Sequence, residues 1–434
     1  MNGWRGTPDA REEALNKKDD YLLSAFGKAA SAALGVVSSA FYIRYLGLSL
    51  KGEYSYINEV ASILAIVFSL GLHQSYPRQT RLGEKGLPGR YGRIYLCQFA
   101  LLMGFAGALS ALAESRGGEG LWMILLQVPF LVLMTQTDCM AMVENIRGYV
   151  LTDLCFKVCL TGLYFALWRF APVDLKYLIL PVQGLRLVKS LVLTALSGAR
   201  PPRQSLREDR ALFRQALSFG FLPMLSTLLV TFNYTLDILF LKSMGTAEEL
   251  SLYTLAALII NYVWMIPDAF KEVLYSRVAR GESETEVRIS IRGSVALVLL
   301  CGGAFALAGR PVLAWVFGAE FLPAWNLVLI LFIGAVSMIY YKMLGVVLIT
   351  EGRTGVYFGI LLSSVLLNAV SNLLMIPRFG MIGAAWSSVL SYTLCGALFL
   401  CCYCRIKKRS VRAYLWPDAE ERAWIRKALG RGKD

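Results

Sequence analysis

Six basic residues lie inside long apolar stretches of the sequence, where charged side chains are rare. A charge at the centre of a bilayer costs about 2.5–3.5 kcal/mol even on lenient insertion scales, so such residues usually face water or the protein interior. Ammonium and guanidinium groups bind phosphate through charge-assisted hydrogen bonds. The sequence therefore predicts a cationic cavity for a phosphate or pyrophosphate group, and its candidate residues are Lys28, Lys157, Arg186, Lys189, Lys271 and Lys342.

Snorkelling is the alternative for the lysines. A lysine near the end of a membrane helix can extend its aliphatic stem so that the ammonium group reaches the lipid head groups. Lys271 and Lys342 fit either interpretation, whereas Arg186 lies too far from both ends of its predicted helix to snorkel. Asp153 and Lys157 are four residues apart on one predicted helix, so they can also neutralise each other.

Acidic residues are fewer within the apolar stretches, and two of them are candidates for ion coupling. An acid inside a membrane helix can bind Na⁺ or a proton and so link transport to an ion gradient. We assign this role to Asp237 and Glu59. The alternative for Asp237 is a residue at the membrane interface that pairs with Lys242 or caps a helix.

Residues that would indicate an enzyme are scarce. The chain has one histidine, His73, and nine cysteines, which lie inside or at the edges of the apolar stretches. Cys401 and Cys404 have CxxC spacing, but a zinc site needs four ligands and the sequence supplies no others nearby. A phosphate-binding P-loop and a Ser/His/Asp set are also missing. We therefore expect a protein that is not an enzyme, with no catalytic residues, no metal and no cofactor.

The elements that position these residues are membrane helices. Hydrophobic residues make up 56% of the 434 residues and charged ones 17%, which leaves too little polar surface for a soluble protein of this size. Crossing a bilayer takes about 20 mostly apolar residues, and their backbone groups must be satisfied within a helix. Roughly twelve stretches qualify, near 21–43, 54–76, 91–113, 120–142, 149–168, 175–197, 216–241, 251–275, 293–308, 324–349, 355–376 and 381–404.

Basic residues outside the helices predict the orientation, since Lys and Arg stay on the cytoplasmic side more often than they are translocated. With the N-terminus inside, 30 of the 44 basic residues lie in cytoplasmic segments and 8 in the opposite loops. Both termini are therefore expected in the cytoplasm. The net charge of +14 follows from this topology and from attraction to anionic lipid, so nucleic-acid binding is not expected.

A polar segment, 198–215, divides the predicted helices into two sets of six. The expected fold is thus an all-α polytopic membrane protein with two six-helix lobes. The predicted parts are an N-tail (1–20), an N-terminal lobe (21–197), the cytoplasmic linker, a C-terminal lobe (216–404) and a basic C-tail (405–434). The loops on the non-cytoplasmic side are short, so no external domain is expected there.

Three passages carry a resemblance to a known family. Residues 366–392 read LLNAVSNLLMIPRFGMIGAAWSSVLSY, an asparagine-bearing helix followed by Ile-Pro, an aromatic-Gly turn and Gly-Ala-Ala. Residues 44–56 read RYLGLSLKGEYSY, and residues 316–331 read VFGAEFLPAWNLVLIL. In order and spacing, over nearly the whole chain, these passages resemble the polysaccharide-transport (Wzx-type) flippases of the multidrug/oligosaccharidyl-lipid/polysaccharide (MOP) superfamily.

The resemblance implies two six-helix lobes in a V shape that work by alternating access around a central cationic cavity. Lys28 and Lys271 lie on helices that line this cavity in the family. The implied substrate is an undecaprenyl-pyrophosphate-linked oligosaccharide, moved across a bacterial cytoplasmic membrane for O-antigen, capsule or exopolysaccharide assembly. Its implied partners are membrane lipid and, in the pathway, a polysaccharide polymerase and glycosyltransferases. Residues expected to contact sugar hydroxyls are Asn233, Asn261, Gln183 and Tyr340.

Two other functions remain as alternatives. A multidrug or cation exporter of the same superfamily would be expected to have an acid-rich cavity, whereas the deep charges here are mostly basic. A membrane polymerase or ligase of the polysaccharide pathway would be expected to carry essential Arg or His residues on a large external loop. The predicted loops of this chain are too short for that.

Overall fold

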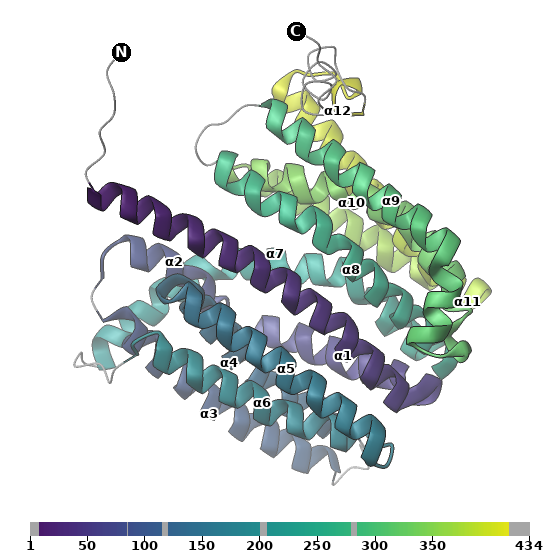
Figure 1. Cartoon of the computed structure of the whole chain (residues 1–434), viewed down its shortest axis with the longest axis horizontal. Coiled ribbons are helices and arrows are strands. Elements are labelled where there is room, and N and C mark those ends of the chain that lie inside the picture. Colours follow the sequence, from purple (N-terminus) through teal and green to yellow (C-terminus); the bar gives the residue numbers. More distant parts are fainter. Residues whose placement is uncertain (1–7, 85, 115–119, 200–205, 279–283, 416–434) are drawn as a thin grey trace. The chain divides into compact units, whose positions relative to one another are not determined.

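The computed structural model describes residues 8–84, 86–114, 120–199, 206–278 and 284–415, and in this part the chain forms helices and no strands (Figure 1). Ten of the helices in the described part are long and apolar enough to cross a membrane, which confirms the predicted polytopic all-α membrane fold. In order, the helices are α1 (Pro8–Phe68), α2 (Leu72–Arg81), α3 (Leu87–Glu114), α4 (Leu121–Glu144), α5 (Ile146–Phe170), α6 (Leu175–Leu196), α7 (Leu206–Met244), α8 (Ala247–Val278), α9 (Glu284–Val316), the 3₁₀ turn η1 (Ala319–Phe321), α10 (Ala324–Thr350), α11 (Thr354–Lys407) and α12 (Arg412–Leu415).

Two of the long helices each contain two of the predicted spans. Gly47 in α1 (φ 63°, ψ −172°) and Gly380 in α11 (φ 55°, ψ −135°) have non-helical backbones and kink the helices there. Both glycines fall where the sequence predicted a break between separate helices. Because only glycine adopts such dihedral angles without strain, one residue changes the chain direction and no loop is required.

Several predicted helix ends are wrong. The predicted second span, 54–76, is interrupted, because α1 ends at Phe68 and α2 begins at Leu72. The predicted ninth span, 293–308, is much too short, since α9 runs from Glu284 to Val316. Hydropathy detects only the apolar core of a helix, and the polar turns that extend beyond it carry no such signal.

The chain folds into two compact units, Met1–Leu228 and Leu229–Asp434. The division falls inside α7, later than the predicted linker 198–215, of which residues 200–205 lie outside the described part. In the N-terminal unit α4 is the central helix, packed against α1, α2, α3, α5 and α6, and α1 also packs along α5. In the C-terminal unit α10 has the same central role, packed against α8, α9 and α11.

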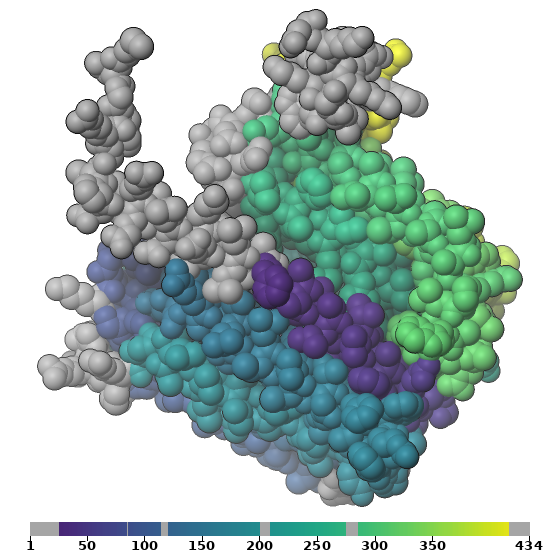
Figure 2. Space-filling view, viewed as in Figure 1, coloured from purple at the N-terminus to yellow at the C-terminus, as the bar shows by residue number. Residues whose placement is uncertain are grey.

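Large apolar side chains are exposed on the outer helices of both units. Figure 2 shows one face of the N-terminal unit, where α1 (purple) and α5 (blue) reach the surface. Phe170 at the end of α5 is 80% exposed, and Leu307 on α9 in the other unit is 89% exposed. Water would disfavour such surfaces, whereas lipid acyl chains solvate them, so this pattern agrees with a bilayer environment.

Glu249 stabilises the kink of α11 within the C-terminal unit. The kink frees backbone N–H groups, and the N–H of Met381 donates to Glu249 Oε1 at 3.2 Å. The other carboxylate oxygen, Oε2, accepts from the Thr246 N–H at 3.0 Å at the start of α8. A Cβ atom at Gly380 would overlap Glu249 Oε1. The Pro-Arg-Phe-Gly turn therefore requires glycine for both conformation and space.

We expect Gly380→Ala to destabilise the protein. The left-handed backbone alone costs a side-chain-bearing residue about 1–2 kcal/mol, and the overlap with Glu249 adds to it. Thermal unfolding in detergent measures the change. Gly359→Ala is the matched control in the same helix, because a Cβ atom there meets open space. Equal effects of the two substitutions would contradict the role given to Gly380.

Candidate functional site

Three groups of charged or polar side chains in the described part contain residues that the sequence singled out. We call them the Lys189 cluster, the Asp237 cluster and the Asp268 cluster, after the residue at the centre of each. The first belongs to the N-terminal unit and the other two to the C-terminal unit. They differ in charge balance and exposure, and these two properties determine what each can bind.

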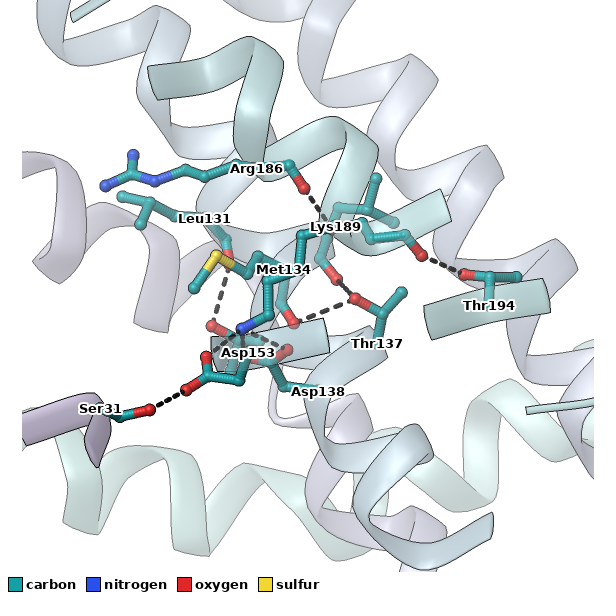
Figure 3. Close-up of polar contacts among 12 residues, drawn as sticks. Ser31, Leu131, Met134, Thr137, Asp138, Asp153, Arg186, Lys189 and Thr194 are labelled. Carbon is teal, nitrogen blue, oxygen red and sulfur yellow. Dashed lines mark hydrogen bonds and ion pairs between the residues drawn. The ribbon is translucent and has the colours of Figure 1, made fainter. Parts of the chain in front are cut away.

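In the Lys189 cluster, one ammonium group is held between two carboxylates (Figure 3). Lys189 on α6 lies 3.0 Å from Asp138 Oδ1 on α4 and 2.9 Å from Asp153 Oδ1 on α5. Its side chain is only 1% exposed, and its ammonium also faces the rings of Tyr149 and Phe156 at 5.7 and 5.2 Å. The ammonium is thus enclosed by partners from within the unit.

The cluster also reaches α1. Ser31 Oγ donates to Asp153 Oδ2 at 2.8 Å, as Figure 3 shows, so one ion-pair network joins α1, α4, α5 and α6. Asp153 pairs with Lys189 on another helix and also interacts electrostatically with Lys157, so its suggested neutralisation by Lys157 stays a prediction. A substrate role for Lys189 stays a prediction, and its geometry assigns it internal partners.

Arg186 lies one turn from Lys189 on α6, but its side chain extends in a different direction (Figure 3). Its Nη1 donates to Gln183 Oε1 at 3.0 Å and to Gln127 Oε1 at 3.4 Å. Gln183 in turn donates to the Ile179 carbonyl at 3.1 Å. The structure therefore brings together Arg186 and Gln183, which the sequence had assigned to the head group and to the sugar.

The remaining candidates of the N-terminal unit are Lys28, Lys157 and Glu59, of which Lys157 interacts electrostatically with Asp138 and Asp153. Lys28 is exposed on α1, and Lys157 is half-buried on α5. Glu59 is half-buried on α1 beyond the kink. The sequence analysis missed Lys51, which it placed in a loop; the structure has it on α1 with only 1% of its surface exposed.

In the Asp237 cluster, a fully buried carboxylate accepts hydrogen bonds from neutral groups. Asp237 on α7 is 0% exposed. Its donors are Tyr253 Oη at 2.6 Å, Asn372 Nδ2 at 2.6 Å, Asn368 Nδ2 at 3.0 Å and Ser388 Oγ. These neutral groups are the partners of Asp237 in the described part, and Lys242 is not among them.

Asn372, which contacts this carboxylate, and Ser387, which precedes Ser388 in the chain, each carry a buried oxygen atom without a partner in the described part. These atoms are Asn372 Oδ1 and Ser387 Oγ. Asn233, expected to contact sugar, is 0% exposed and accepts from Ser364 Oγ at 3.0 Å. Unsatisfied buried polar atoms are rare and call for an explanation such as a bound ion or proton transfer. One carboxylate with spare oxygen ligands is a donor set that fits Na⁺ or a proton.

The spacing of two asparagines in the sequence already indicated part of this cluster. Asn368 and Asn372 are four residues apart in an apolar helix and therefore share one face. Ser388 follows the Gly380 kink, which returns the chain beside that face. The motif that carried the family resemblance thus supplies three of the four donors to Asp237.

In the Asp268 cluster, positive charge exceeds negative charge, unlike in the Asp237 cluster. Lys342 on α10 lies 2.9 Å from Asp268 Oδ1 and 2.8 Å from Oδ2, while Lys271 lies 2.9 Å from the same Oδ1. The ammonium of Lys342 also lies 5.4 Å from the ring centre of Trp264. Two ammonium groups share one carboxylate, and the side chains of Asp268 and Lys271 are 37% and 38% exposed. Nearby on the same helices, Asn261 is exposed and Tyr340 half-buried.

Solved structures of two transporter types match this chain over most of its length. The lipid II flippase MurJ, in an inward closed conformation, matches with a TM-score of 0.60 and 12% identity, over 91% of this chain and 89% of that one. An inward-facing multidrug resistance MATE transporter matches with a TM-score of 0.64 and 14% identity, over 89% and 96%. The chain has the MOP-superfamily fold.

A third MOP-fold structure differs in the character of its pocket. A MOP superfamily transporter from Pyrococcus furiosus, described as having a binding pocket of reverse polarity, matches with a TM-score of 0.58 and 12% identity, over 91% of this chain and 95% of that one. At these identities the likeness concerns the fold alone. No protein-family model and no curated protein matches the sequence.

We expect Lys189→Met to destabilise the N-terminal unit strongly. Removing one partner of a buried ion pair costs about 3–5 kcal/mol, and here it takes from two carboxylates the cation that contacts them both. Thermal unfolding in detergent tests this, and Asp138→Asn in the same background should restore part of the loss. Lys176→Met, an exposed lysine at the start of α6, is the control. A Lys189→Met protein as stable as this control would contradict the structural role.

Proposed function

We propose that this MOP-fold protein is an alternating-access flippase for an undecaprenyl-pyrophosphate-linked oligosaccharide of surface polysaccharide assembly. The observation that carries the proposal is the Asp268 cluster, where an excess ammonium group is partly exposed. An anionic head group is the complement of such a site, while the lipid tail stays in the bilayer. The proposed protein is a transporter of the bacterial cytoplasmic membrane and has no catalytic residues.

The physical task is to replace the hydration of a charged head group during its passage. Lysine ammonium groups bind phosphate as point charges with three donors each. Lys271 and Lys342 supply two ammonium groups that can contact the same oxygen atom, because both contact Asp268 Oδ1. Lys28 and Arg186 are the further candidates, and the exposed Asn261 is a candidate for sugar hydroxyls.

We expect alanine substitution of Lys271 to reduce surface glycan at equal protein level by at least tenfold, because it removes about half of the proposed phosphate-binding charge. Lys28→Ala and Arg186→Ala are measured alongside, and Lys176→Ala is the control. The readout is complementation of a strain that lacks its flippase, followed by transport of a fluorescent lipid-linked oligosaccharide in proteoliposomes. Unchanged output from all three substitutions would remove the proposed site.

Ion coupling at the Asp237 cluster is the second part of the proposal. Its support is the buried carboxylate, whose partners in the described part are neutral, and the Oδ1 atom of its neighbour Asn372, which has no hydrogen-bond partner there. A bound Na⁺ or proton would neutralise the carboxylate, and the donors from α8 and α11 would rearrange around it. Asp237 is preferred over Glu59, for which no comparable set of contacts is found in the described part.

We expect Asp237→Asn to abolish the dependence of transport on an ion gradient while substrate binding persists. Proteoliposomes with an imposed Na⁺ gradient, and separately a pH gradient, identify the ion. Size-exclusion profile and thermal stability establish that the variant folds, and Asp237→Glu tests whether a displaced carboxylate retains coupling. Gradient-driven transport by Asp237→Asn at the wild-type rate would overturn the assignment.

A multidrug or cation exporter is the competing function, favoured by the match to MATE transporters. Organic cations need an acidic cavity that is large and accessible, whereas Asp237 is fully buried. Efflux of a cationic dye by reconstituted protein distinguishes the two. Dye transport that survives Lys271→Ala and Lys342→Ala would favour the exporter.

A further inference from the structure

The Asp268 cluster has a feature that a simple phosphate site would not need, which is a carboxylate between its two lysines. Asp268 Oδ1 lies 2.9 Å from the ammonium of Lys271 and 2.9 Å from that of Lys342. It thus occupies the position from which an anion would contact both lysines. A bound phosphate and Asp268 cannot hold this position at the same time.

The two lysines are anchored differently. Lys342 is 8% exposed and lies against Trp264, whose own ring packs 4.6 Å from Tyr234 and 5.5 Å from Tyr392. Its ammonium group is therefore held in place by α10 and by an aromatic wall. Lys271 and Asp268 lie one turn apart on α8 and are each more than one third exposed. The exposed pair has room to rearrange, whereas Lys342 is buried against Trp264.

This difference makes release of Asp268 conditional on a replacement anion. A buried ammonium group without a partner is strongly unfavourable. Asp268, by contrast, loses little when it turns away, because its side chain already contacts solvent. A phosphate group that arrives at Lys342 brings more negative charge and more acceptor oxygens than one carboxylate.

The Lys189 cluster differs from the Asp268 cluster in both its charge balance and its exposure. In the Lys189 cluster two carboxylates hold one ammonium group that is 1% exposed, and Lys157 also interacts with both carboxylates, so the cluster has no excess of positive charge for a further anion. In the Asp268 cluster the net charge of the three groups is positive and the cluster is partly open. Charge balance and exposure together make the Asp268 cluster, rather than the Lys189 cluster, the one suited to exchanging its anion.

We propose that Asp268 is a built-in counter-ion of the Lys271–Lys342 pair, which the phosphate of the substrate head group displaces on binding and which returns to expel it. The proposal rests on the proposed function for the identity of the substrate. Its consequence is that the site binds the substrate phosphate with lower affinity than the two lysines alone would. An apparent dissociation constant rises in inverse proportion to the fraction of protein that is competent to bind, so competition by Asp268 weakens binding.

The test measures binding of inorganic pyrophosphate, and then of undecaprenyl pyrophosphate, to the purified full-length protein in nanodiscs. We expect Asp268→Asn to lower the dissociation constant at least fivefold and to slow dissociation, since the internal competitor is gone. Lys342→Met should raise the dissociation constant at least tenfold. Asp268→Ala is a second variant in case the first folds poorly, and the exposure of this side chain means that truncation leaves no sealed cavity.

Glu248→Gln is the matched control. It makes the same change in net charge on the same helix, α8, from an exposed position in the first turn. Tighter binding in Asp268→Asn alone supports the counter-ion role. Equally tighter binding by Glu248→Gln would indicate a general effect of net charge. Unchanged binding by both Asp268 variants would show that Asp268 does not compete with the anion. Either result overturns the proposal.

Failure of this inference and failure of the proposed function give different results. If wild-type protein flips the lipid-linked oligosaccharide but Asp268 variants bind pyrophosphate as wild type does, the flippase stands and the counter-ion does not. If Asp268→Asn tightens pyrophosphate binding but wild-type protein flips no lipid-linked oligosaccharide, the anion exchange stands and the substrate assignment fails.

Discussion

The cost of placing a charge away from water organises this protein. In a lipid-embedded chain each ionised side chain must find an opposite charge, a set of hydrogen bonds or an open path to solvent. The structure contains one example of each solution. Lys189 has two carboxylates, Asp237 has four neutral donors, and Asp268 shares its charge between two lysines beside solvent. The same physical rule thus accounts for a structural ion pair at Lys189, a candidate ion site at Asp237 and a candidate anion site at Asp268.

The helices that carry these groups explain why the clusters form where they do. In the C-terminal unit, Gly380 turns α11 back so that Ser388 and Asn372, from either side of the kink, reach the same carboxylate. Glu249 fastens that turn through the N–H of Met381. A backbone feature at one end of the unit therefore determines the geometry of a polar site in its interior.

The proposed transport function uses the difference between the clusters. A binding site for cargo has to be both attractive and reversible, because a group held too tightly is not released. The Asp268 cluster combines an excess of positive charge with an internal anion that can return. The Lys189 cluster, more buried and without an excess of positive charge, is suited to holding four helices together.

Membrane helices and buried charges could be predicted from the sequence, whereas helix ends and side-chain partners could not. The membrane helices and the unusual depth of Arg186, Lys271 and Asp237 follow from hydropathy and the near absence of charge around them. Helix ends such as those of α9 could not be predicted, because polar turns extend helices beyond their apolar cores. The partners of Lys189 were missed because Asp138 and Asp153 lie on other helices, and nothing in linear spacing identifies which faces meet.

The sequence by itself therefore determined that this is a bundle of membrane helices with rare interior charges, since composition and period are properties of the chain. Tertiary structure alone decided which charge meets which. Lys271 and Lys342 are far apart in the chain and share one carboxylate only because α8 packs on α10. Charge balance is a property of contacts in space, and it separates a structural ion pair from a site that can bind an anion.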